Sequence, residues 1–364
     1  MKIAFYGSSL LSSYWNGAAT YYRGMLADLA RRGYQITFFE PDAFDRQKHR
    51  DIEPPDWAEV KVYPATEDAA RAVIAEAARA DVVVKASGVG VFDDELLEGV
   101  VAASLPDAIR IFWDVDAPAT LADLAANRDH ALHRAMPALD LVLTYGGGPP
   151  VVTAYENFGA RRCIPVYNAL DPETHHPVPA DARFTADLSF LGNRLPDRET
   201  RVEQFFLEPA ARLTDRSFLI GGNGWESKGM PANVRHIGHV YTRDHNAFNT
   251  SPLAVLNIAR DSMASTGYSP ATRVFEAAGA GACLITDAWV GLEHFLRANE
   301  EVLVARDGKD VADHVEALTP ERAKAIGEAA RIRVMAEHTY GRRGAQVDAI
   351  LRDETMRKRE RSVA

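Results

Sequence analysis

The sequence contains few cysteines, no long apolar run and no excess of basic residues. Its 364 residues include only 2 cysteines, Cys163 and Cys283, which lie far apart and in none of the spacings of metal or redox sites. This usage fits a reducing compartment, so we expect a cytoplasmic protein with two buried thiols. No segment approaches the ~18 consecutive apolar residues of a membrane-spanning helix. Polar residues after Gly7 interrupt the first apolar run too early for a signal peptide.

The charge balance is acidic. Asp and Glu number 51 against 41 Lys and Arg, which gives a net charge of −10. Because nucleic-acid binding draws on excess Lys and Arg, we expect no nucleic-acid partner. With 47% apolar and 25% charged residues, the composition is that of a folded chain, and the length predicts two domains.

Short apolar strands alternate with Ala-rich helical stretches along almost the whole chain. In the first half the expected strands are Lys2–Tyr6, Gln35–Glu40, Asp81–Lys85, Ala108–Trp113 and Leu139–Thr144. The expected helices between them include Ala18–Arg32, Asp93–Ala103 and Ala119–Arg134. The second half repeats this style, and the alternation predicts β-α-β units with parallel sheets.

A Pro-rich stretch around residues 163–187 interrupts the alternation. We therefore predict an α/β protein with two Rossmann-like, doubly wound parallel-sheet domains facing across a cleft. Their expected extents are an N-terminal domain at 1–165, a linker at 166–184, a C-terminal domain at 185–338, and a helix crossing back with a basic, frayed tail at 339–364. Ligands of such folds bind at the carboxyl ends of the strands.

The segment from Thr266 to Asp287 carries the most informative chemistry. Ser269 suits an N-cap and Pro270 the first helical position, which predicts a helix whose free N–H groups can hold a phosphate. Glu276 follows among apolar and small residues, where an unpaired carboxylate would be costly. Two hypotheses stay open: ribose hydroxyls bind this carboxylate, or Arg273, three residues earlier, pairs with it.

The run from Arg273 to Asp287, RVFEAAGAG followed by TD, resembles the nucleotide-binding helix of GT-B-type glycosyltransferases. More narrowly, it resembles the branch related to the spore protein CgeB. The resemblance implies the GT-B fold, with the nucleotide sugar held by the C-terminal domain and the acceptor by the N-terminal one. In this family a Glu of the helix binds the ribose, a role that falls on Glu276. Many retaining relatives carry another Glu eight positions earlier, where this chain has Tyr268, so the stereochemical outcome is not predicted.

Two loops of the C-terminal half are similar to the same family. The loop after strand Asp187–Leu191 resembles the one whose basic residue neutralises the donor diphosphate, a role that falls first on Arg198 and second on Arg194; both also suit solvated loop positions. Trp225, which ends a Gly-rich loop, either stacks on a base or fills the core. The residues predicted to bind the nucleotide sugar are Glu276, Arg273, Thr272, Ser269, Arg198, Gly192, Asn193, Gly222, Asn223, Gly224 and Trp225.

The loop after the first strand resembles the family loop that borders the donor phosphates and the acceptor. Its candidate residues are Gly7, Ser8, Ser9, Trp15, Asn16 and Gly17. The loop matches neither the dinucleotide fingerprint G-x-G-x-x-G nor a P-loop, which disfavours an oxidoreductase.

Asp114 and Asp116 follow a buried strand and resemble the acidic strand end of CgeB-like relatives. Either is a candidate general base for the acceptor hydroxyl, Asp116 ahead of Asp114. Asp116, followed by Pro118, also suits an ordinary helix start.

No histidine has a carboxylate or cysteine beside it in sequence that would complete a zinc site. The paired histidines are His130 and His133, His175 and His176, and His236 and His239. Enzymes of the GT-B type generally stabilise the leaving diphosphate with helix dipoles and basic side chains. We therefore expect neither a metal nor a cofactor.

Together these features predict a glycosyltransferase. It would move a hexosyl or related sugar from a nucleotide-diphospho-sugar, a UDP-sugar by family precedent, to a hydroxyl of a glycan, protein or small molecule. Two alternatives stay open. A non-hydrolysing nucleotide-sugar epimerase would need the donor alone, and a non-catalytic nucleotide-binding or structural protein of the same fold would not react at all.

Overall fold

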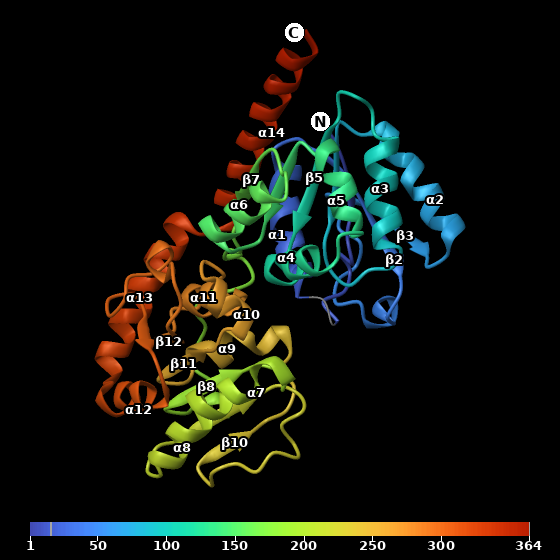
Figure 1. The fold of residues 1–364 in the computed structure, drawn as a ribbon. Helices are drawn as coiled ribbons and strands as arrows, with labels where there is room; N and C mark the ends of the chain where they lie inside the picture. Colours follow the sequence, from blue (N-terminus) through green and yellow to red (C-terminus); the bar gives the residue numbers. More distant parts are fainter. Residues whose placement is uncertain (15–16, 364) are drawn as a thin grey trace. The chain divides into compact units, whose positions relative to one another are not determined.

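The computed structural model describes residues 1–14 and 17–363 and divides the chain into two units (Figure 1). The N-terminal unit comprises Met1–Tyr167 and Tyr340–Ala364, and the C-terminal unit comprises Asn168–Thr339. Each unit is built on one parallel sheet, of seven strands in the first and six in the second. The predicted class of two doubly wound α/β domains is therefore confirmed.

The sheet of the N-terminal unit has the strand order β3-β2-β1-β4-β5-β6-β7. Its strands are β1 (Lys2–Tyr6), β2 (Gln35–Asp42), β3 (Glu59–Pro64), β4 (Val82–Ala86), β5 (Ile109–Asp114), β6 (Leu141–Thr144) and β7 (Cys163–Pro165). In the register of the central pairs, Ile3 lies opposite Ile36 and Phe112 opposite Val142. Every residue of β4 and β6 is buried, because helices cover both faces of the sheet.

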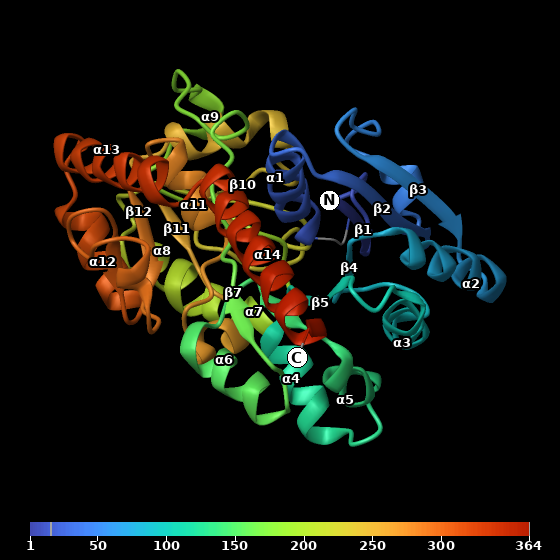
Figure 2. The same cartoon turned by 90° about the horizontal axis from the view of Figure 1, so that it is seen from above.

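One face of this sheet is covered by α2 (Glu67–Ala75), α3 (Asp93–Ala103), α5 (Ala131–Ala135) and α6 (Gly148–Asn157). On the other side, α1 (Ala18–Arg31) packs against α14 (Tyr340–Val363), which Figure 2 shows lying alongside it. The expected frayed tail is wrong, since α14 continues to Val363. In its last turns, Lys358 forms an ion pair of 2.7 Å with the buried Asp140.

The single helix expected over Ala119–Arg134 is also wrong. The structure has α4 (Ala117–Ala126) and, after a break, α5. The Asn127 side chain accepts a hydrogen bond from the backbone N–H of Asp129, which favours a turn over helix. The His130 ring then caps α5 by accepting from the N–H of Leu132.

The C-terminal unit has the strand order β10-β9-β8-β11-β12-β13. Its strands are β8 (Leu188–Leu191), β9 (Phe218–Gly221), β10 (Val234–His236), β11 (Ala254–Asn257), β12 (Leu284–Asp287) and β13 (Leu303–Ala305). Its helices are α7 (Pro196–Val202), α8 (Glu208–Arg212), α9 (His245–Thr250), α10 (Asp261–Thr266), α11 (Thr272–Gly279), α12 (Gly308–Ala317) and α13 (Pro320–Glu337). The main core lies between the sheet and α7, α8 and α12, while α11 packs against β11, β12 and α13. Among the described residues, no helix is long and apolar enough to span a membrane.

Candidate functional site

Helix α11 holds Arg273 and Glu276, two of the three charged residues expected to bind the nucleotide sugar, but it begins later than predicted. Its N-cap is Ala271, and Thr272 is its first residue. The prediction of an N-cap at Ser269 is wrong, because its buried hydroxyl donates to the carbonyl of Gly267 at 2.9 Å. The preceding Tyr268 has a φ of +47°, and this left-handed turn keeps the segment out of the helix.

Glu276 faces two histidines that are distant in sequence. His175, His245 and Glu276 each offer a ligand atom, and these three atoms lie within 4.8 Å of one another. Burial by itself would raise the pKa of Glu276, but electrostatic interactions with His175, Arg273 and His245 hold that pKa below its ordinary value. Burial lowers the pKa of His245, against the opposing effect of Glu276. The carboxylate is therefore ionised at neutral pH.

Arg273 lies one turn before Glu276 on the same helix. Burial lowers the pKa of its guanidinium, and the charge of Glu276 counters this effect. Its Nη1 atom is buried and has no hydrogen-bond partner among the residues that the structure describes. A buried cationic donor without a partner is costly, so this atom marks a place suited to an anion.

The loops that follow β8 and β9 interlock. Gly192 donates its N–H to the carbonyl of Gly221 at 3.0 Å, and the side chain of Asn193 accepts from the N–H of Asn223 at 3.0 Å. Trp225, 1% exposed, donates its indole N–H to the carbonyl of Gly192 at 2.7 Å. Trp225 thus fills the core and supports the loop, which is the second of the two hypotheses for it.

The two candidate arginines of the β8 loop have different partners. Arg194 donates to the carboxylate of Glu199 at 2.7 Å, and Lys228 donates to the same carboxylate at 3.1 Å. Hydrogen bonds from both lower the pKa of Glu199 to about 2. Arg198 instead donates to the carbonyl of Asn193 at 2.8 Å and lies over the ring of Phe190. Arg194 is therefore part of an ion-pair cluster with Glu199 and Lys228.

In the N-terminal unit, two buried charged residues hold the loop after β1. Glu40, near the carboxyl end of β2, accepts from the Ser9 hydroxyl at 3.1 Å and from the N–H groups of Leu10 and Leu11. Arg46 donates to the carbonyl of Val89 at 2.7 Å and to that of Ser8 at 3.4 Å.

Sequence reasoning missed both Glu40 and Arg46. The available signal was a carboxylate ending the apolar run QITFF. Gly17 is the N-cap of α1, and the candidates Trp15 and Asn16 lie outside the described residues.

Asp114 and Asp116 differ in their surroundings. Asp114 is fully buried and accepts hydrogen bonds from Ser87 at 2.7 Å, Tyr155 at 2.5 Å and Thr120 at 3.0 Å. Burial raises its pKa despite these donors. Asp116 occupies the N-cap position of α4 without a capping hydrogen bond from its side chain. The bonding of Asp114 is that of a structural group, so Asp116 stays the better candidate for contact with a substrate.

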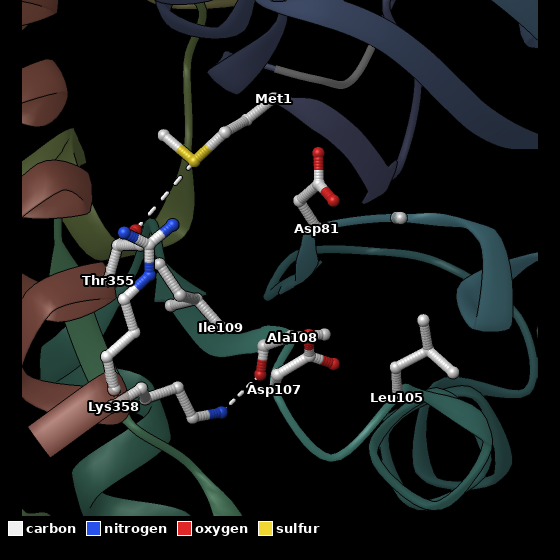
Figure 3. Close-up of a pocket in the computed structure, with 10 residues that line it drawn as sticks. Met1, Asp81, Leu105, Asp107, Ala108, Ile109, Thr355 and Lys358 are labelled. Carbon is white, nitrogen blue, oxygen red and sulfur yellow. Dashed lines mark hydrogen bonds between the residues drawn. The ribbon is translucent and has the colours of Figure 1, made fainter. Parts of the chain in front are cut away.

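A pocket of about 690 Å³ lies elsewhere in the N-terminal unit, at the amino ends of β4 and β5 (Figure 3). Met1, Asp81, Asp107 and Lys358 are among its lining residues. It contains none of the predicted site residues. The candidate residues lie instead at or beyond the carboxyl ends of strands, where ligands of parallel α/β sheets bind.

Comparison with known proteins supports the predicted family. Residues 198–349, which include Arg198 and α11, match the family described as glycosyl transferase-like. Among curated proteins, no sequence is significantly similar to this chain.

Several solved structures share the fold over nearly the whole chain. Anabaena HepE, solved in complex with UDP and glucose, is 14% identical, with a TM-score of 0.68 over 97% of this chain and 100% of that one. Sucrose-phosphate synthase from Thermosynechococcus elongatus is 12% identical, with a TM-score of 0.69 over 97% and 98% of the two chains. An alpha-glucosyltransferase in complex with UDP-glucose and DNA is 10% identical, with a TM-score of 0.70 over 96% and 99%.

At these identities the likeness establishes the fold and not the substrates. Membership of the CgeB-like branch stays a prediction. The chain has the fold of GT-B-type glycosyltransferases, and within it residues 198–349 match the glycosyl transferase-like family.

Proposed function

We propose that the chain is a glycosyltransferase that moves a hexosyl or related sugar from a nucleotide-diphospho-sugar to an acceptor hydroxyl. One observation carries the proposal: within the family-matched residues, α11 presents a buried guanidinium nitrogen, with no hydrogen-bond partner in the described part of the chain, one turn before an ionised carboxylate. A nucleoside diphosphate needs both groups, a cation for its phosphates and a hydrogen-bond acceptor for its ribose hydroxyls.

The donor-binding roles follow from this pairing. Glu276 accepts hydrogen bonds from the ribose hydroxyls, and Arg273, Arg198 and the free N–H groups at the start of α11 bind the diphosphate. These positive groups stabilise the leaving diphosphate, so transfer proceeds without a metal ion or cofactor. UDP is the favoured nucleotide, because structural relatives were solved with UDP or UDP-glucose.

The acceptor is assigned to the N-terminal unit. Asp116 would take the proton of the acceptor hydroxyl as general base. One structural relative was solved with DNA, but the net charge of −10 favours a glycan, protein or small-molecule acceptor here. A nucleotide-sugar donor and two unpaired thiols agree with a cytoplasmic location. The acidic strand end and the α11 motif support the CgeB-like branch.

Thermal unfolding with nucleoside diphosphates tests the donor assignment. The wild type, Glu276→Gln and a matched control, Glu316→Gln on the exposed side of α12, are each heated with UDP, GDP, dTDP, ADP or CDP. At ~100 times its dissociation constant, the correct nucleotide stabilises the native state by about 2.7 kcal/mol. We expect one nucleotide to raise the midpoint of the wild type and of the control but not that of Glu276→Gln. An equal shift in all three proteins, or no shift with any nucleotide, would contradict the assignment.

Product analysis then separates the alternatives. A transferase forms glycoside only when an acceptor is added, whereas an epimerase converts the donor alone. A non-catalytic protein does neither.

A further inference from the structure

Three chain segments of the C-terminal unit converge beside α11, where His175 is buried and His245 and Glu276 are partly buried. His175 lies in the segment after Leu170, His245 is the first residue of α9, and Glu276 lies in the middle of α11. No two of these residues are close in sequence. Only the tertiary structure of this unit therefore completes a set of ligands around His175.

The backbone around His175 is fixed on two sides. A Cβ atom on Gly279 would lie 2.3 Å from Leu170 Cδ1 and 3.1 Å from the carbonyl oxygen of His175, so the glycine allows this segment to pack directly on α11. On the other side, the Asn246 side chain of α9 donates to the carbonyl of Thr174 at 2.9 Å and accepts from the N–H of His176 at 3.3 Å. These contacts hold His175 in place before any ligand binds.

The side chains have the composition of a zinc site. His175 is 4% exposed, and its Nε2 atom is buried without a hydrogen-bond partner among the described residues. The Nε2 atom of His245 lies 3.3 Å from the carbonyl oxygen of Val240. A hydrogen bond to this carbonyl fixes the tautomer of His245 and leaves Nδ1 as a lone-pair donor. Two imidazoles and one carboxylate are a common protein ligand set for zinc, with the fourth position open.

The spacing of the ligand atoms agrees with this chemistry. They lie within 4.8 Å of one another, whereas tetrahedral zinc places its ligands about 3.4 Å apart. Zinc binding would therefore require side-chain rotations that bring the ligand atoms closer together. Arg273 adds a positive charge near Glu276, so the affinity of the site for a metal ion must come from the imidazole nitrogens rather than from net negative charge. This favours zinc over magnesium or calcium, which prefer several oxygen ligands.

We propose that His175, His245 and Glu276 bind a zinc ion, and that this ion competes with the nucleotide for Glu276. The first part stands on the three side chains alone. The second part rests on the proposed function, because it needs Glu276 to bind the ribose. Sugar transfer itself needs no metal in this scheme, and zinc bound here inhibits it.

Equilibrium dialysis of untagged, EDTA-treated protein against zinc chloride, without nucleotide, tests the site. We expect the wild type to bind one equivalent of zinc and no magnesium. His175→Gln and His245→Gln should each weaken zinc binding at least about tenfold. The matched control is His176→Gln, which changes the adjacent, exposed histidine and should bind zinc like the wild type. Thermal unfolding in EDTA checks that each variant is folded.

A wild type that binds no zinc, or equal zinc binding by His175→Gln and His176→Gln, overturns the site.

Competition is tested by adding UDP, which should release zinc from the wild type. His175→Gln should lose zinc but keep UDP binding, whereas Glu276→Gln should lose both. Unchanged UDP affinity in saturating zinc overturns the competition. Zinc binding without any nucleotide binding would overturn the proposed function and leave the zinc site standing.

Discussion

Replacing Gly222 with alanine should destabilise the C-terminal unit and displace the predicted donor-binding loops. Gly222 has a φ of +118°, and a Cβ atom there would lie 2.3 Å from the backbone carbonyl oxygen of Gly192. The same carbonyl accepts the indole N–H of Trp225, so it cannot move without weakening that bond. Backbone strain of about 1–3 kcal/mol and a steric clash of about 1–3 kcal/mol add to roughly 2–6 kcal/mol.

Calorimetry and urea titration measure this loss. At about 2–4 °C per kcal/mol, the unfolding midpoint should fall by at least roughly 4 °C. The control is Gly229→Ala, because Gly229 is exposed and an added Cβ would meet nothing within 4 Å. This variant should stay within about 1 kcal/mol of the wild type. If Gly222→Ala unfolds at the same temperature as Gly229→Ala, the described approach of the two loops is wrong.

Three further predictions follow from the site. Because its neighbours hold the pKa of Glu276 below its ordinary value of 4.5, ionisation of Glu276 stabilises the native state above that pH, and this stabilisation is lost as the pH falls through the lowered pKa. The free energies of unfolding of the wild type and Glu276→Gln, measured in urea, should therefore converge under acid conditions. A difference that stays constant with pH would contradict this. Asp116→Asn should reduce the rate of sugar transfer about 10²–10⁴-fold without changing the UDP-induced thermal shift. The control Asp123→Asn, an exposed change on α4, should leave both the transfer rate and the thermal shift unchanged. Equal activity of the two variants would refute the role of Asp116. Burial raises the pKa of the Cys163 and Cys283 thiols to about 12. Neither thiol should therefore react with a thiol reagent at about pH 8 until the protein unfolds. A thiol that reacts in the native protein would show that it is not buried.

Strongly patterned elements of the fold were predictable from the sequence. Strand β1 and helix α3 have the predicted bounds, because an apolar run and a periodic helix with three acidic residues in its first turn need no distant partner to be recognised. Helices α9 and α10, at six residues each, were missed. Helices this short gain little from intrinsic propensity and form mainly through tertiary packing.

For the candidate site, too, the sequence predicted some features and missed others. The sequence identified Glu276 and Arg273 because charged residues in a small-residue helix stand out against their neighbours. It left the role of Trp225 open, and its burial decided for the core. It also placed the N-cap of α11 at Ser269, because local capping chemistry gives no warning of the left-handed turn at Tyr268.

The sequence by itself determined the α/β class, the two-domain plan and the helix that carries the proposed donor-binding charges. These properties are encoded in local periodicity and in the spacing of residues along single elements. Only the tertiary structure showed that Glu40 and Arg46 hold the first loop and that His175 and His245 surround Glu276. These groups come from segments far apart in the chain, and the parallel sheets and the close approach at Gly279 decide which of them meet.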